Sequence, residues 1–81
     1  NNEHPLVAQS IQNLAHLYSD LGNDKEAEAL YKQALAINEK VFGANHPIIA
    51  TILSNLASTY YHQEDNAEAE KLIQRTLSIR Q

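Results

Sequence analysis

His16, Asp20 and His62 are the residues of this chain whose types and spacing could bind a metal ion. His16 and Asp20 lie four positions apart, which places both on one face of a helix, and His62 takes the place of Asp20 in a second stretch of similar sequence. Packed helices lie about 10 Å apart, so coordination shared between two of them would be strained. We therefore expect solvated polar side chains here and no metal ion.

Uncharged hydrogen-bonding side chains dominate the polar face of the same two stretches. The strongest candidates are Asn13 and Asn55, because a carboxamide can donate to a backbone carbonyl of an extended peptide and accept from its N–H. The alternative is that each amide ties its own helix to a neighbour across a loop. The predicted peptide-binding residues are Gln9, Gln12, Asn13, His16, Asp20, Thr51, Ser54, Asn55, Ser58 and His62.

The composition argues against most other chemistry. The 81 residues include no cysteine, no glycine-rich phosphate loop and no serine, histidine and carboxylate with a reason to converge, so we expect neither an enzyme nor a cofactor. The net charge of -4 argues against a nucleic-acid partner, and the short apolar runs argue against a membrane partner. Because no leader opens the sequence, we expect a cytoplasmic protein.

The chain repeats itself at a period of 42 residues. The segment HPLVAQSIQNLAHLY at 4–18 returns as HPIIATILSNLASTY at 46–60. Aligning 4–39 with 46–81 gives 13 identities in 36 positions, where unrelated sequences would give roughly two. Self-similarity at a fixed period is typical of stacked supersecondary units.

Apolar residues recur at three- and four-residue steps in four segments, which indicates four helices and an all-α fold. Alanines at matched positions on these stripes, at 15, 27, 57 and 69, allow the two helices of each unit to approach closely. The predicted buried stripes are Val7, Ile11, Leu14, Ala15, Tyr18 and Leu21; Ala27, Leu30, Tyr31, Ala34, Leu35, Asn38, Val41 and Phe42; Ile49, Leu53, Leu56, Ala57 and Tyr60; and Ala69, Leu72, Ile73, Thr76 and Leu77.

Capping signals agree with this division into helices. Asn23 precedes Glu26 by three positions, and Asp65 precedes Glu68 in the same way. The Asn or Asp side chain can accept from backbone N–H groups of the first turn while the glutamate reaches back. We expect the second helix of each unit to begin at these residues.

Turn residues mark where the first helices begin and where the two units meet. Pro5 and Pro47 suit a first helical turn, where the missing N–H costs nothing, and Gly43 suits a left-handed residue after a helix. His4 and His46 directly precede the prolines, so we expect them to serve the turns.

These motifs resemble the tetratricopeptide repeat, most closely the 42-residue variant found in kinesin light chains. The likeness is carried by NLAHLY, Gly22, EAEALYKQAL and EKVFGANHP in the first unit and by NLASTY, EAEKLI and TL in the second. The second unit departs from the pattern, with Glu64 for Gly22, Ile73 for Tyr31 and Thr76 for Ala34. We expect these departures to affect how the C-terminal helix packs, and not the fold itself.

The resemblance implies two stacked helix-turn-helix repeats that form a short right-handed α-solenoid. We expect one domain over 1–81, with repeat 1 at about 4–45 and repeat 2 at about 46–81, as a fragment of a longer array. The resemblance also implies a scaffold for protein or peptide partners, which bind in a groove lined by the first helix of each repeat and need no catalytic chemistry.

The positions of the charges narrow the class of ligand. None of the basic residues lies in a first helix; they are Lys25, Lys32, Lys40, Lys71, Arg75 and Arg80. Similar domains grip acidic peptides with lysine or arginine in the groove, whose charge-assisted hydrogen bonds are strong. We therefore expect a neutral or basic peptide segment.

The two ends of so short an array should expose apolar surface. About three repeats are usually needed to cover such faces, and burial stabilises by about 25 cal/mol per Å². Either flanking repeats cover them, or copies of the chain stack end to end as a homo-oligomer. Ile52 and Tyr61, which replace Ser10 and Ser19, could contact a partner or an adjoining repeat. The predicted self-association residues are Val7, Ile11, Leu14, Ile73, Leu77 and Ile79.

Overall fold

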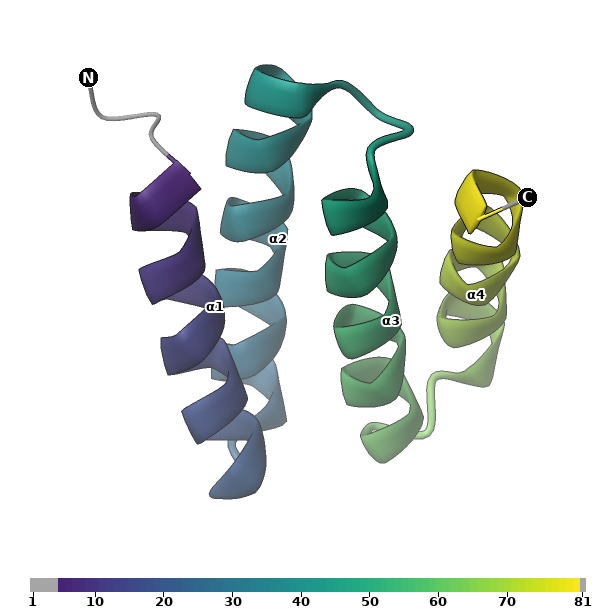
Figure 1. The fold of residues 1–81 in the computed structure, drawn as a ribbon. Coiled ribbons are helices and arrows are strands. Elements are labelled where there is room, and N and C mark those ends of the chain that lie inside the picture. Colours follow the sequence, from purple (N-terminus) through teal and green to yellow (C-terminus); the bar gives the residue numbers. More distant parts are fainter. Residues whose placement is uncertain (1–4, 81) are drawn as a thin grey trace.

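The computed structural model describes residues 5–80, and these form four helices in two antiparallel pairs (Figure 1). The helices are α1 Pro5–Asp20, α2 Asp24–Phe42, α3 Pro47–His62 and α4 Asn66–Arg80. Each helix packs against its neighbour along the chain, which produces a slab of 35 × 29 × 13 Å. The predicted all-α fold of stacked helix-turn-helix repeats is confirmed.

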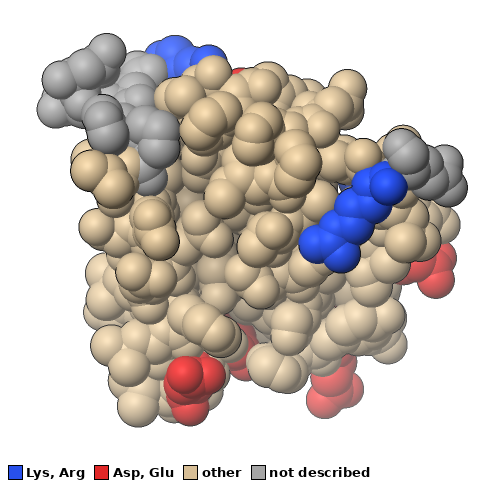
Figure 2. Space-filling model, viewed as in Figure 1, with Lys and Arg blue, Asp and Glu red and all other residues tan. Residues whose placement is uncertain are grey.

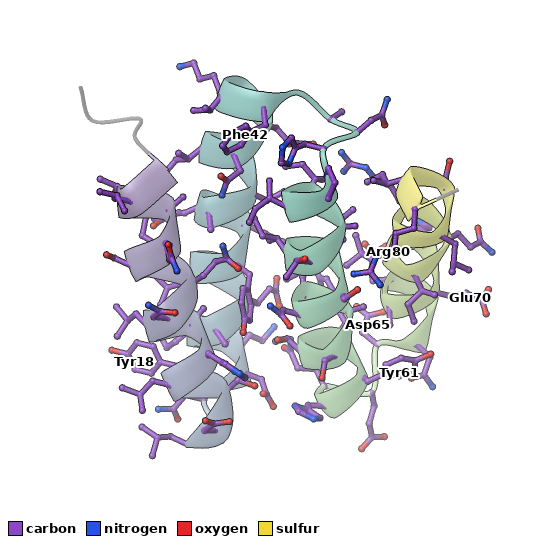
Figure 3. All side chains as sticks on the ribbon, viewed as in Figure 1. Tyr18, Phe42, Tyr61, Asp65, Glu70 and Arg80 are labelled. Carbon is purple, nitrogen blue, oxygen red and sulfur yellow. The ribbon has the colours of Figure 1, made fainter. Side chains whose placement is uncertain are left out.

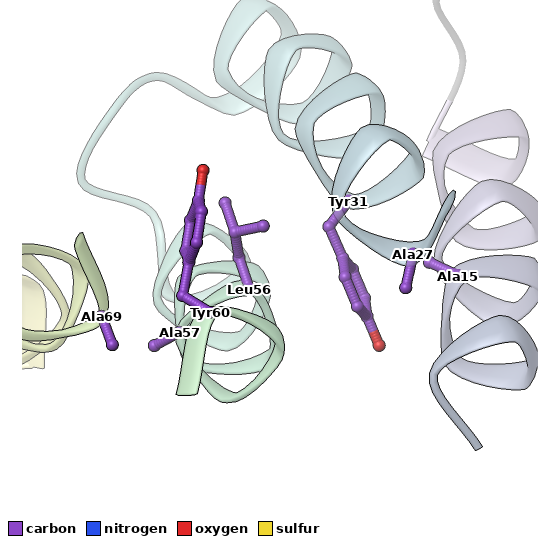
Figure 4. Packing of buried hydrophobic residues seen from close by; sticks show 7 residues of the cluster. All are labelled: Ala15, Ala27, Tyr31, Leu56, Ala57, Tyr60 and Ala69. Carbon is purple, nitrogen blue, oxygen red and sulfur yellow. The ribbon is translucent and has the colours of Figure 1, made fainter. Parts of the chain in front are cut away.

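Small residues let the helices of each pair approach closely. Ala15 meets Ala27 between α1 and α2, and Ala57 faces Ala69 between α3 and α4 (Figure 4). All four alanines are buried, as their recurrence at matched positions predicts. Close approach brings backbone and Cβ atoms into van der Waals contact, so the pairs are held by packing density rather than by large side chains.

Larger side chains fill the joint between the two pairs. Tyr31 of α2 packs with Leu56 and Tyr60 of α3, and Ile52 packs against Ala8 and Ala34. Ile52 is fully buried, so this residue contacts the adjoining repeat rather than an outside partner. Tyr61, the other residue whose role the sequence left open, is exposed.

The buried stripe of α1 differs from the predicted one. Ala8 and Ala15 are the fully buried residues of this helix, whereas Val7, Leu14 and Leu21 are exposed. The prediction counted every apolar residue at helical spacing as buried. However, within residues 5–80, α2 is the one helix with which α1 makes extensive contact, and α1 reaches α3 where Ala8 meets Ile52, so a narrow stripe of small residues suffices to seat it.

The predicted capping residues and prolines lie at the helix starts, and one of the predicted side-chain caps does not form. Pro47 occupies the first turn of α3, and the His46 side chain caps that helix by accepting from the Ile48 N–H at 3.1 Å. Asp65 accepts from the Glu68 N–H at 3.4 Å, as predicted. The capping prediction for Asn23 is wrong, because its side chain makes no cap hydrogen bond.

The turn after α2 requires a glycine. Gly43 has φ +86° and ψ 168°, a conformation that side chains rarely adopt, and its N–H closes the helix on the Glu39 carbonyl. The positive φ agrees with the prediction, although the ψ value lies outside the left-handed helical region. His4 lies outside the described residues.

Candidate functional site: a neutral pocket between the first helices

A pocket of about 370 Å³ opens between α1 and α3 near the N-terminal ends of both helices. Its walls come from the first helix of each repeat, and its floor comes from the C-terminal part of α2. Phe42 lies at that end of α2, between α1 and α3, in Figure 3. The lining residues are Gln9, Gln12, Asn13, Asn38, Phe42, His46, Ile48 and Thr51.

The aromatic part of the lining is held in place by the turn between the repeats. The Phe42 and His46 rings stack with their centroids 4.5 Å apart. Because His46 Nδ1 accepts from the Ile48 N–H, the neutral imidazole carries its proton on Nε2 and can donate there. The turn therefore supplies one apolar surface and one oriented polar group.

The floor of the pocket carries a buried carboxamide. Asn38 is almost fully buried and donates from Nδ2 to the Ala34 carbonyl at 3.0 Å. This hydrogen bond fixes the orientation of the amide, which leaves its oxygen as an acceptor for a bound group. Together with Gln9, Gln12 and Asn13, it makes the pocket rich in carboxamides, which suits the N–H and C=O groups of a peptide backbone.

The structure brings four of the ten predicted peptide-binding residues together in this pocket: Gln9, Gln12, Asn13 and Thr51. Ser54 and Asn55 are half-buried further along α3. Among the described residues, neither Asn13 nor Asn55 makes a side-chain hydrogen bond, so the interpretation that the amides tie helices together has no such contact to support it. Three more predicted residues, His16, Asp20 and Ser58, are exposed outside the pocket.

His62 lies at the other end of this face. Its Nδ1 is 3.5 Å from Asp24 Oδ1, a buried carboxylate oxygen that makes no hydrogen bond within residues 5–80. Asp20 also lies at this end, because its charge acts on the Tyr31 hydroxyl: burial raises the pKa of Tyr31, and the Asp20 carboxylate adds to the shift. In the described part of the chain, no three His, Cys, Asp or Glu side chains come together as metal ligands.

A network around Glu28 links the two repeats beside this end. Gln63 donates to one Glu28 oxygen at 2.9 Å, and Lys32 and the Tyr60 hydroxyl donate to the other at 2.9 and 3.4 Å. The Gln63 hydrogen bond, followed by the Lys32 contacts, lowers the pKa of Glu28 below its ordinary value. Arg75 of α4 pairs with Glu39 of α2 in the same way across the joint.

The face formed by α1 and α3 carries little charge. Figure 2 shows its middle free of lysine, arginine and carboxylates, with carboxylates near its lower edge and basic side-chain atoms towards α4. Lys32, Lys71 and Arg75, by contrast, pair with glutamates of the second helices. The surface available to a ligand is therefore neutral at the pocket and acidic towards Asp20 and Asp24.

Four lining residues were not predicted as site residues: Asn38, Phe42, His46 and Ile48. Asn38 and Phe42 were assigned to the buried stripe of the second helix, and His46 to the turn. Asn38 is buried and His46 caps α3, as predicted. The assignment to buried stripes is wrong for Phe42 and Val41 of α2 and for Leu77 of α4, which are exposed because no described helix covers those sides. The second helix was correctly predicted to reach Phe42, and the missing signal was the direction of the turn after it, which places Phe42 beside His46.

The predicted end faces are exposed in part. Val7 and Leu14 on α1 and Leu77 on α4 are exposed, whereas Ile11 and Ile73 pack against the core clusters and Ile79 is half-buried. Leu17 and Leu21 extend the exposed apolar surface on the α1 side, although the prediction did not include them.

The comparisons with known proteins agree with this geometry. The family model described as tetratricopeptide repeat matches residues 6–81, so the chain belongs to the tetratricopeptide repeat family. Tetratricopeptide repeats are a protein-interaction fold without catalytic chemistry of their own. No curated protein matches the chain. None of the helices in residues 5–80 is long and apolar enough to cross a membrane.

Proposed function

We propose that the chain is a protein-interaction scaffold that holds a neutral or basic peptide segment along α1 and α3. The observation that carries this proposal is the pocket of about 370 Å³, whose lining contains four carboxamides and no carboxylate, lysine or arginine. Burying an unpaired charge in such a site is costly, whereas carboxamides can satisfy both the N–H and the C=O of a peptide. Phe42 and Ile48 add room for an apolar side chain.

The acidic end of the same face favours a basic residue in the ligand. Asp20 is exposed, and Asp24 has one buried oxygen without a hydrogen bond in the described chain. A lysine or arginine at one end of the peptide would place its charge near these carboxylates and form a charge-assisted contact. An acidic peptide would meet the same carboxylates as like charges.

A library of random peptides displayed on phage, selected on the immobilised chain, tests this proposal. We expect the selected peptides to be neutral or basic and to share an apolar residue. Replacing Gln12 or Asn13 with Ala should weaken their binding about tenfold, because each change removes a hydrogen-bonding group from the pocket.

Gln33→Ala is the matched control, since Gln33 is an exposed glutamine of α2 that does not line the pocket. It should leave binding unchanged. Selection of acidic peptides, or binding that Asn13→Ala leaves unchanged, would contradict the proposal.

A second candidate function is structural: copies of the chain associate end to end through their apolar faces. The exposed Val7, Leu14 and Leu77 favour this function, because covering them removes apolar surface from water. Light scattering as a function of concentration tests it. Association should persist in Asn13→Ala, which alters the pocket alone, and a strictly monomeric chain at high concentration would contradict it.

A further inference from the structure

The helices α1 and α4 lie at opposite ends of the molecule (Figure 1), and both expose apolar side chains. We infer that two copies of the chain join through them in the same register as α2 and α3 within one copy. In this joint, α4 of one copy takes the place of α2, and α1 of the next copy takes the place of α3. The joint rests on the end-to-end association proposed above and adds its partner helix and its register.

The 42-residue period identifies the residues of α1 that would be covered. Val7 and Leu14 correspond to Ile49 and Leu56 of α3. Val7 is 42% and Leu14 43% exposed, whereas Ile49 is 0% and Leu56 2% exposed. The difference arises because α3 lies between α2 and α4, whereas within residues 5–80 the neighbours of α1 all lie on one side of it (Figure 1). A helix placed against α1 as α2 lies against α3 would bury the same positions.

The outer face of α4 supplies the matching side. Ile73 and Leu77 correspond to Tyr31 and Leu35 of α2. Within one copy, Tyr31 packs with Leu56 in the core, so the register places Ile73 of one copy against Leu14 of the next. Leu77 is 58% exposed and would be covered in the same step. No charge opposes this contact on α1, whose one charged residue is Asp20 at its last position.

The period also predicts a polar contact across the joint. Within one copy, the Tyr60 hydroxyl of α3 donates to the Glu28 carboxylate of α2. Their counterparts are Tyr18 and Glu70, which lie on α1 and α4, at opposite ends of the molecule, in Figure 3. Tyr18 of one copy can therefore donate to Glu70 of its neighbour. Such a contact fixes the register, because a shift by one residue would separate the two groups.

The joint between copies is less apolar than the joint within one. Ser10 stands where α3 has Ile52, and Thr76 stands where α2 has Ala34. Ile52 and Ala34 pack together in the core, so this polar pair loses part of the internal packing. We expect reversible association that depends on concentration. Since the two faces differ, each added copy leaves one face open and the assembly does not close at a dimer.

Complementary variants test the joint by sedimentation of the whole chain from micromolar to millimolar concentration. Leu14→Glu blocks the α1 face and Leu77→Glu blocks the α4 face, and both positions are exposed, so folding should survive. Each variant alone should be monomeric, because every contact needs one face of each kind. An equimolar mixture should form a dimer and nothing larger, through the intact α4 face of Leu14→Glu and the intact α1 face of Leu77→Glu. If Leu14→Glu fails to fold, Leu17→Glu blocks the same face.

Other outcomes overturn the joint in distinguishable ways. A wild-type chain that stays monomeric at millimolar concentration overturns end-to-end association itself. Association that survives in either single variant, or a mixture that stays monomeric, overturns the pairing of α1 with α4 alone. Binding of peptides to the pocket is measured separately and does not depend on either result.

Three further variants test the register. Ser10→Ile should tighten association about tenfold, because it restores the residue that the internal joint has at this position. Tyr18→Phe and Glu70→Gln should each weaken association about threefold, and the double variant should be no weaker than either one. Additive effects of Tyr18→Phe and Glu70→Gln, or no gain from Ser10→Ile, would contradict this register.

Discussion

Glu64 is the one non-glycine residue with positive φ among residues 5–80, at +63°. It stands in the second repeat where the first has Gly22, whose φ is +83°. An L side chain in this region crowds the backbone and costs about 1 kcal/mol. The two turns therefore have the same shape but different intrinsic stability.

Substitutions at Glu64 and Gly22 should change the free energy of unfolding in opposite directions. Glu64→Gly, or Glu64→Asn, should stabilise the chain by about 0.5 to 1 kcal/mol. Gly22→Ala should destabilise it by about 1 kcal/mol, although a Cβ there would meet no atom within 4 Å, because the cost is conformational. Urea unfolding of the variants measures both values. A Gly22→Ala chain as stable as the wild type would contradict the argument.

Glu28 gives a prediction for the dependence of stability on pH. Its carboxyl has a lowered pKa in the folded chain, so the unfolded chain binds more protons as the pH falls through its ordinary value of about 4.5. The stabilisation that the Glu28 carboxylate contributes is therefore fully present above that pH and is lost as the pH falls further. Glu28→Gln should therefore lower stability at pH 7 and flatten its decline below pH 4.5.

Urea unfolding at a series of pH values measures this difference. Glu26→Gln, at an exposed position of the same helix, is the control. If Glu28→Gln retained the full decline of the wild type below pH 4.5, protonation of Glu28 would not be the cause of that decline.

At the scale of the helices, the joint between α2 and α3 depends on Ile52. This side chain is fully buried against Ala8 and Ala34, so Ile52→Ser should create a cavity and cost about 3 kcal/mol. The converse change at the equivalent position, Ser10→Ile, should alter the stability of the monomer by less than about 0.5 kcal/mol, because Ser10 is exposed. Thermal or urea unfolding at low concentration compares them. If the two substitutions changed the free energy of unfolding equally, Ile52 would not stabilise the chain through the joint between α2 and α3.

Helix number, pairing and the close alanine contacts could be predicted from the sequence, because the two repeats carry the same local pattern. Which apolar residues of α1 are buried could not. Val7 and Leu14 have the spacing of a core stripe, but no described helix covers the outer side of α1, so both are exposed. The Asn23 prediction failed for a related reason: a capping sequence permits a side-chain hydrogen bond but does not enforce it.

The sequence predicted the pocket residues that share one face of α1. It did not predict the pocket residues that the turn between the repeats contributes. Gln9, Gln12 and Asn13 share a face of α1 by spacing alone. Phe42 and His46 join them through the turn at Gly43, whose backbone conformation sets the direction of the chain between repeats. Periodicity does not encode that direction.

At the scale of the whole molecule, the slab offers two kinds of surface to partners. The face of α1 and α3 carries a neutral, carboxamide-rich pocket, and the outer sides of α1 and α4 carry apolar residues. The pocket residues Gln12 and Asn13 and the end residue Leu14 are neighbours in sequence but face different directions on α1. Association through the ends would therefore leave the pocket open, so the two proposed functions are compatible.

We propose that the face of α1 and α3 selects a neutral or basic peptide segment. The most direct test is NMR titration of the ¹⁵N-labelled chain with a selected peptide and with its counterpart carrying glutamate at each lysine. The lysine peptide should shift the amide signals of Gln9, Gln12, Asn13 and Thr51 and bind more tightly. Tighter binding of the glutamate peptide, with shifts at the same residues, would contradict the account.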